Sequence, residues 1–222
     1  MVPKKSLFLA FVIIVFAIYN YSFEERVDSD SISENLINKQ QEINDISYDE
    51  KLTMFIGNES IATDSSFLIK KPNMYKRVDQ VNSSTCLTIG SDGILTWEYD
   101  PIKNKTWLMN NISQNPSQST PTYSEFIDSI SDNCTINYKG IEYLGEVKTY
   151  KLEVISSKLS EPEGWRRLLW IDPKIWMPLK IQSYNGDKLL MTLEYENYSI
   201  NSGIKDAEFK FKPPEGTEVV NI

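Results

Sequence analysis

Hydrophobic and polar residues alternate along most of the chain from Tyr48 onward. A period of two places successive apolar side chains on one face, which is typical of β-strands with one buried side. The pattern therefore predicts strands in the segments Ile94–Tyr99, Tyr150–Val154, Ile175–Ile181 and Leu189–Tyr195.

Dipeptides that favour tight turns separate the alternating segments. Asp-Gly and Asn-Gly between such segments are strong signals for a β-hairpin, and X-Pro pairs also favour turns. Turns are predicted at Asp92-Gly93, Asp100-Pro101, Lys139-Gly140, Asp172-Pro173 and Asn185-Gly186. We expect an antiparallel sheet of roughly ten strands, because short connections join strands that are neighbours in the sheet.

Two helices are predicted in addition to the strands. Ser31 and Glu34 form a capping box, and the apolar residues that follow fit one helical face up to about residue 46; they are Ile32, Leu36, Ile43 and Ile46. A loop over 115–121 is rich in Pro, Ser and Gln. Thr122 and Glu125 then form a second capping box, which predicts a central helix with the apolar face Tyr123, Phe126, Ile127 and Ile130.

The N-terminus has the pattern of an export signal. Lys4 and Lys5 precede an apolar run over 7–19, and a basic region before a short apolar core is typical of a secretory signal. Continued to Phe23, the run would make a helix of roughly 25 Å, which is short against a hydrocarbon core of about 30 Å. Residues 1–23 are therefore interpreted as a cleaved signal peptide or as an uncleaved signal anchor. Lys4 and Lys5 precede the apolar run and the acidic linker 24–30 follows it, and this asymmetry places the domain, 31–222, outside the cytoplasm.

Seven Asn-X-Ser/Thr motifs agree with an exported chain. Each is a candidate for N-glycosylation where it is exposed, although a surface rich in Asn and Ser would contain the same motifs. They begin at Asn20, Asn58, Asn82, Asn104, Asn111, Asn133 and Asn197.

The two cysteines, Cys86 and Cys134, are compatible with one disulfide in an oxidising compartment or with two buried thiols.

Charge and composition argue against several classes of function. The net charge of −8 disfavours nucleic acid, because phosphate contacts need clustered Lys and Arg. The chain has no histidine, which removes Ser-His and Cys-His nucleophiles and the usual zinc ligand. Carboxylates could still pair as in a glycosidase, but turn and surface positions explain them equally; the nearest candidates are Asp172, Asp187, Glu194 and Glu196. We expect no enzyme, no cofactor and no metal.

Large apolar side chains are the strongest remaining signal. Residues 168–171 and 189–191 are apolar on both faces of their strands, which a sheet with one solvated side does not need. A sheet wrapped around a helix and a hydrophobic cavity does need it, and methionine suits a surface that adapts to varied apolar ligands. Plain core packing is the alternative. The lipid-facing candidates are Leu95, Trp97, Trp107, Met109, Leu152, Met177, Leu179, Met191 and Leu193.

Several segments, in their order and spacing, resemble the LolA-like lipoprotein carrier and sorting proteins. That superfamily also includes RseB-type periplasmic sensors and LppX-type lipid carriers. The segment FLIKKPNMY is similar to a family strand followed by Lys-Pro-x-x-Tyr/Phe, and FKFKPPEGTEV is similar to its closing strand. The segments that carry the resemblance are Phe67–Tyr75, Ser91–Pro101, Tyr138–Leu152, Trp170–Lys180 and Phe209–Val219.

The resemblance implies a mainly β (α+β) fold, an incomplete antiparallel β-barrel or strongly curved sheet whose concave face is plugged by the N-terminal and central helices. It implies a cavity that receives the acyl chains of lipid or of a lipidated protein, and no catalytic residue. The arginine that closes the carrier's lid has no clear match in Arg77, Arg166 or Arg167. The alternative is a membrane-anchored sensor or protein-interaction module. The glycosylation motifs and the missing lipid-attachment cysteine favour an archaeal cell surface, where no outer membrane receives lipoproteins.

Overall fold

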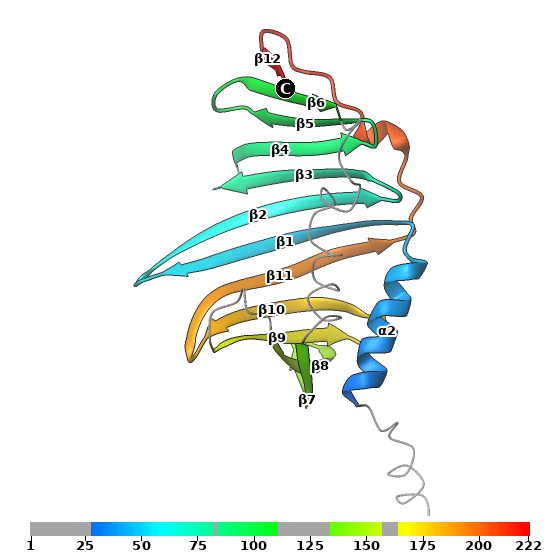
Figure 1. Cartoon of the computed structure of the whole chain (residues 1–222), viewed down its shortest axis with the longest axis vertical. Helices are drawn as coiled ribbons and strands as arrows, with labels where there is room; N and C mark the ends of the chain where they lie inside the picture. Colours follow the sequence, from blue (N-terminus) through cyan, green and yellow to red (C-terminus); the bar gives the residue numbers. More distant parts are fainter. Residues whose placement is uncertain (1–27, 82–83, 111–133, 157–163) are drawn as a thin grey trace, which may run out of the picture.

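The computed structural model describes residues 28–81, 84–110, 134–156 and 164–222. Twelve strands form one sheet in the order β12-β6-β5-β4-β3-β2-β1-β11-β10-β9-β8-β7 (Figure 1). Their bounds are β1 Asp45–Ile56, β2 Glu59–Lys70, β3 Met74–Val81, β4 Ser84–Asp92, β5 Leu95–Asp100, β6 Lys105–Asn110, β7 Cys134–Leu144, β8 Val147–Ser156, β9 Trp165–Asp172, β10 Met177–Asn185, β11 Lys188–Ile200 and β12 Glu218–Asn221.

Two antiparallel meanders make up the sheet. β1 to β6 pair in sequence order, β7 to β11 do the same, and β1 pairs with β11 to join the two halves. The exception to antiparallel pairing is β12, which lies parallel to β6 at one edge. The mainly β, unclosed and curved sheet is confirmed, with twelve strands where roughly ten were predicted. The predicted central helix and the predicted signal segment lie outside the described residues.

Helix α2 (Ser29–Glu42) precedes the sheet and differs from the prediction at both ends. Asp28, not Ser31, is the N-cap, because its side chain accepts a hydrogen bond of 2.8 Å from the Ser31 amide. The helix ends at Glu42 with Ile43 as its C-cap, so the predicted end near residue 46 is wrong. No helix in the described part of the chain is long and apolar enough to cross a membrane.

Four of the five predicted turns connect strands, and the fifth is a β-bulge. Lys139 and Gly140 lie inside β7, where the pairing with β8 shifts by one residue between Tyr138 and Gly140. Gly140 has a φ of 108°, which only glycine adopts readily. The bulge therefore uses the glycine that the sequence pattern assigned to a turn, and the hairpin turn itself falls at 145–146.

One face of the sheet, called the inner face below, packs against α2. Ile32 and Leu36 of the helix are fully buried there. The main core forms between them and the strands β1, β2, β8, β9, β10 and β11; its strand residues are Ile46, Tyr48, Phe67, Leu152, Val154, Leu169, Ile171, Met177, Ile181 and Tyr195. Ile43 belongs to the same core, which explains why the spacing of residues 32 to 46 resembled a single helical face.

The opposite, outer face is covered in part by the C-terminal segment 201–222. The ammonium group of Lys70 holds the start of this segment through the Ile204 carbonyl at 2.7 Å and the Asp206 carboxylate at 2.6 Å. The ring of Phe211 then stacks on Trp97 with centroids 4.2 Å apart. β12 completes the segment by pairing with β6 (Figure 1). The segment therefore gives β5 a second small core, separate from the one under α2.

Candidate ligand-binding face of the sheet

The inner face has a filled half beside α2 and a more open half toward the β1–β2 hairpin tip. In the filled half the rings of Tyr48 and Phe67 stack at 4.8 Å, and Tyr195 meets Tyr48 edge-on at 5.8 Å. Leu36 and Leu152 have no exposed surface. These side chains occupy the space between helix and sheet, so this half of the face is packed core.

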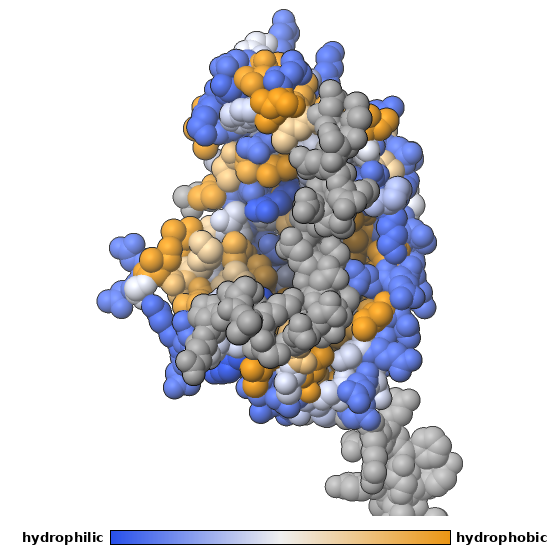
Figure 2. Space-filling view, viewed as in Figure 1, coloured by the Kyte–Doolittle hydropathy of each residue, from blue (hydrophilic) through white to orange (hydrophobic). Residues whose placement is uncertain are grey.

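The open half carries an apolar strip, defined here as Leu52, Met54, Ile61, Met191 and Leu193. The strand register brings these residues together: Leu52 lies opposite Leu193, and Met54 lies between Ile61 on β2 and Met191 on β11. Leu52 and Met54 follow Tyr48 at intervals of two residues along β1, so they face the same side of the sheet. Their partners Ile61, Met191 and Leu193 therefore also lie on the inner face. Met54 is 39% exposed and Ile61 52%. Figure 2 shows hydrophobic residues gathered over the free end of β1 and β2.

A polar cluster separates the packed core from the apolar strip. It consists of Glu50, Ser65, Arg77 and Asp79 on β1, β2 and β3, together with the core residue Tyr195 on β11, whose side chain borders it. Glu50 lies opposite Ser65 and Tyr195, and Ser65 lies opposite Asp79. Asp79 accepts hydrogen bonds from the Ser65 hydroxyl at 2.7 Å and from Arg77 Nε at 2.6 Å. The carboxylate of Asp79 is thereby satisfied although the residue is buried.

The electrostatics of the cluster centre on Glu50. Burial removes its carboxyl from water and raises its pKa above the ordinary value, against the opposing effect of Arg77. Burial also raises the pKa of Tyr195 well above 10, and the nearby Glu50 charge adds to this shift. Tyr195 therefore stays a neutral phenol that shares a hydrogen bond with Glu50.

The structure divides the nine predicted lipid-facing residues among five environments, the fifth of which is the outer face described in the next paragraph. Met191 and Leu193 belong to the apolar strip. Trp107 and Met109 are half-buried and lie on the inner face of β6, because they pair with Glu98 and Thr96. Leu152 and Met177 are fully buried in the core that α2 covers. Leu179 is half-buried, where the pairing of β9 and β10 shifts.

Leu95 and Trp97 are placed on the outer face, away from the other seven. Thr96 pairs with Ser91 on β4, and Ser91 pairs with Tyr75 on β3, so all three lie on the inner face. Trp97 is the next residue along β5 and pairs with Gly90, so it lies on the outer face. Trp97 is 2% exposed beneath Phe211. Leu52, Met54, Ile61 and the polar cluster were missed, although the alternation Tyr48, Glu50, Leu52, Met54, Ile56 is visible in the sequence.

The other predicted positions are placed as follows. No disulfide joins Cys86 and Cys134 in the structure, because β4 and β7 lie apart in the sheet with β3, β2, β1, β11, β10, β9 and β8 between them. Asn58, Asn104 and Asn197 are exposed. Asn20, Asn82, Asn111 and Asn133 fall outside the described residues.

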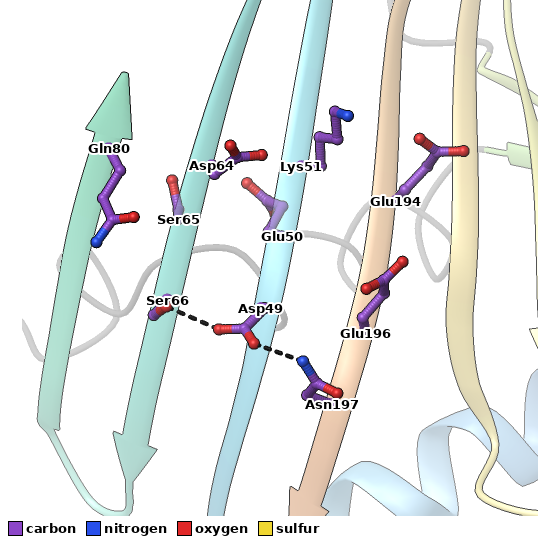
Figure 3. A pocket seen from close by; sticks show the side chains of 10 residues that line it. All are labelled: Asp49, Glu50, Lys51, Asp64, Ser65, Ser66, Gln80, Glu194, Glu196 and Asn197. Carbon is purple, nitrogen blue, oxygen red and sulfur yellow. Dashed lines mark hydrogen bonds between the residues drawn. The ribbon is translucent and has the colours of Figure 1, made fainter. Parts of the chain in front are cut away.

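A polar pocket of about 290 Å³ lies over β1, β2, β3 and β11 (Figure 3). The candidate carboxylates Glu194 and Glu196 line this pocket, whereas Asp172 is the last residue of β9 and Asp187 lies in the turn between β10 and β11. Asp49 accepts hydrogen bonds from Ser66 at 2.7 Å and from Asn197 at 2.8 Å. Its lining is polar and charged, with Asp49, Glu50, Lys51, Asp64, Ser65, Ser66, Gln80, Glu194, Glu196 and Asn197. Such a lining does not suit an acyl chain. No group of three or more metal-binding side chains occurs among the described residues.

Comparison with known proteins shows one sequence relative and several structural ones. No family model matches the chain. The uncharacterized protein MJ0687 of Methanocaldococcus jannaschii is 28% identical over 218 residues, or 98% of this chain, and the chain spans 61% of that relative's length.

Solved structures are similar at low sequence identity. An uncharacterized conserved protein from Thermus thermophilus matches with a TM-score of 0.56 and 12% identity, over 86% of this chain and 99% of that one. MucB, in the Pseudomonas aeruginosa MucA/MucB complex, matches with a TM-score of 0.50 and 11% identity, over 81% and 61%. A LolA superfamily protein from Nitrosomonas europaea has a TM-score of 0.37 and 14% identity, over 83% and 98%. The matches with TM-scores of 0.50 and above show that the chain shares its fold with the Thermus thermophilus protein and with MucB.

Proposed function

We propose that this domain binds an acyl chain, or another extended apolar group, on the inner face of its sheet and catalyses no reaction. The observation that carries the proposal is the apolar strip. Its residues share a face with the packed core, they are in register across β2, β1 and β11, and Met54 and Ile61 are still substantially exposed. Exposed apolar residues gathered on one face mark a site of interaction.

The expected affinity for a single acyl chain is weak. Burying a methylene group contributes about 0.8 kcal/mol, so about ten methylenes would contribute roughly 8 kcal/mol. Association costs an estimated 4–15 kcal/mol in lost freedom of motion. At the lower cost about 4 kcal/mol remains in favour of binding, so binding is weak and reversible. Such binding suits a protein that takes up lipid or the acyl chain of a lipidated protein and releases it again.

The proposed location is the extracytoplasmic side of the membrane. The basic and apolar pattern of residues 1–23 supports export, either as a cleaved signal or as an anchor. The proposed glycosylation of the exposed Asn58, Asn104 and Asn197 would also require export. The resemblance of the sequence to the LolA-like superfamily also supports this location, because that superfamily includes periplasmic sensors.

A second candidate function is recognition of a protein partner. The MucA/MucB complex shows a protein of the same fold with a protein partner. The apolar strip would accept an apolar segment of a polypeptide by the same burial of methionine, leucine and isoleucine side chains. The chain would then be a surface sensor or interaction module and not a carrier.

Two adjacent residues of β2 provide the test. Ile61 and Ala62 are both exposed, but Ile61 lies opposite Met54 on the inner face and Ala62 lies opposite Thr53 on the outer face. Ile61→Asp puts a charge into the apolar strip, whereas the matched control Ala62→Asp puts it on the other side of the same strand. The measurement is displacement of a fluorescent fatty acid from the full chain by unlabelled fatty acid.

We expect Ile61→Asp to weaken fatty-acid binding roughly tenfold or more, because a buried apolar contact is replaced by a charge that resists desolvation. Ala62→Asp should bind as the unmodified chain does. Equal binding by all three proteins would remove the strip from the site. Absence of binding by the unmodified chain would favour the protein-recognition function.

A further inference from the structure

Glu50 has an unusual position among the charged residues of the sheet. It lies on the inner face of β1, between Tyr48 in the packed core and Leu52 in the apolar strip. The residue is 7% exposed. Its Oε2 atom is buried and has no hydrogen-bond partner, either in the polar cluster or elsewhere among the residues that the structure describes. A buried carboxylate oxygen without a donor is costly, so its presence needs an explanation.

The neighbouring charges do not supply that partner. Arg77 donates its Nε hydrogen to Asp79, which also accepts from Ser65. Tyr195 shares one hydrogen bond with Glu50 and is neutral. The cluster therefore contains two acidic side chains and one basic side chain, and the basic one is engaged with Asp79 in a 2.6 Å ion pair.

Because the apolar strip begins at the next inner-facing residue, a group bound at Glu50 would continue directly onto it. From Glu50 to Ile56, β1 extends roughly 20 Å at about 3.3 Å per residue. We propose that Glu50 receives the ammonium group of an amphiphile, a primary amine whose apolar chain lies along the strip. This inference rests on the proposed function and adds to it the chemistry of the head group.

An ammonium group fits the site for two reasons. It brings the missing positive charge, and it is a donor with three hydrogens that can reach Oε2 while leaving the Tyr195 hydrogen bond in place. Burial already raises the pKa of Glu50; a bound cation would oppose that effect and favour the carboxylate. A carboxylate or phosphate head group cannot donate to Oε2 and is disfavoured beside Glu50 and Asp79, so a fatty acid binds the apolar strip through its chain alone and more weakly than the amine.

The test compares two ligands with the same chain, dodecylamine and dodecanol, by displacement of a fluorescent acyl probe from the full chain at pH 7. The test variant is Glu50→Gln, which keeps the size and removes the charge. The matched control is Glu196→Gln, which makes the same change at an exposed residue of the polar pocket. Circular dichroism confirms that each variant is folded.

We expect the unmodified chain and Glu196→Gln to prefer dodecylamine roughly tenfold or more, the value of a charged hydrogen bond. Glu50→Gln should lose the preference and bind dodecanol as before. If both ligands bind but Glu50→Gln keeps the preference, the inference is overturned and the proposed function stands. If the unmodified chain binds neither ligand, the proposed function fails and the inference falls with it.

Discussion

Replacing Trp97 by alanine tests whether the outer-face core is independent of the ligand-binding face. The sequence pattern placed Trp97 among the lipid-facing residues, whereas the register places it opposite Gly90 on the outer face. There it stacks on Phe211 with an interplanar angle of 13°. If this placement is correct, Trp97→Ala destabilises the fold and leaves binding by the folded protein unchanged.

The size of the effect follows from burial. Trp97 is 2% exposed, and a buried aromatic side chain removes about 150–250 Å² from water. At about 25 cal/mol per Å², this corresponds to roughly 4–6 kcal/mol, and measured losses for Trp→Ala in cores are about 3–5 kcal/mol. Because domains are stable by about 5–15 kcal/mol, such a loss is large but leaves a folded population to study.

The assay is equilibrium urea unfolding followed by circular dichroism. Trp107→Ala is the control, because Trp107 is half-buried on the inner face and has Lys105 5.6 Å from its ring centre. We expect it to cost roughly 1–2 kcal/mol, less than the loss for full burial. Trp97 does not belong to a separate outer-face core if Trp97→Ala costs less than Trp107→Ala, or if folded Trp97→Ala has lost the fatty-acid affinity that Trp107→Ala keeps.

Three further predictions test other parts of the structure. Leu36→Ala should lower the free energy of unfolding by about 2–5 kcal/mol in urea, because Leu36 is fully buried beneath the sheet; a smaller loss would contradict the packing of α2. Gly90→Ala should cost about 1–3 kcal/mol in the same assay, since the new methyl group would overlap the Trp97 ring and lie 2.8 Å from the Tyr75 carbonyl oxygen. The raised pKa of Glu50 means that the folded state holds this proton more tightly than the unfolded state. Stability should therefore fall as the pH rises from the ordinary value of 4.5 through the raised one. Glu50→Gln should remove that part of the fall, which thermal unfolding from pH 4 to 7 would detect; an unchanged pH profile would contradict the burial of Glu50.

The strands and most turns were predictable because their signals are local. Alternation with a period of two, and turns such as Asn185-Gly186, depend on neighbouring residues alone. The ends of α2 were less predictable, since the pattern of Ile43 and Ile46 fits a helix as well as it fits a helix end followed by a strand. Gly140 shows the same ambiguity, because glycine serves both turns and bulges.

The face on which a side chain lies was not predictable from alternation. Period two shows that Leu95 and Trp97 share a face, but the register with β4 decides which face that is. The C-terminal segment that covers Trp97 lies more than one hundred residues away in sequence, and the sequence of β5 itself does not indicate that this segment packs there. The polar cluster was missed for a related reason, since Glu50 and Asp79 look like ordinary surface acids until the register places them beside Tyr195.

The proposed function requires that an apolar chain lies along the open half of the inner face. Photolabelling tests it directly: a fatty acid with a photoreactive group on its chain is bound to the full chain, irradiated, and the labelled residues are identified by mass spectrometry of peptides. We expect labels on β1, β2 and β11 at Leu52, Met54, Ile61 and Met191, and we expect them to disappear when unlabelled fatty acid competes. Labels that resist competition, or that cluster around Trp97 and Phe211 on the outer face, would contradict it.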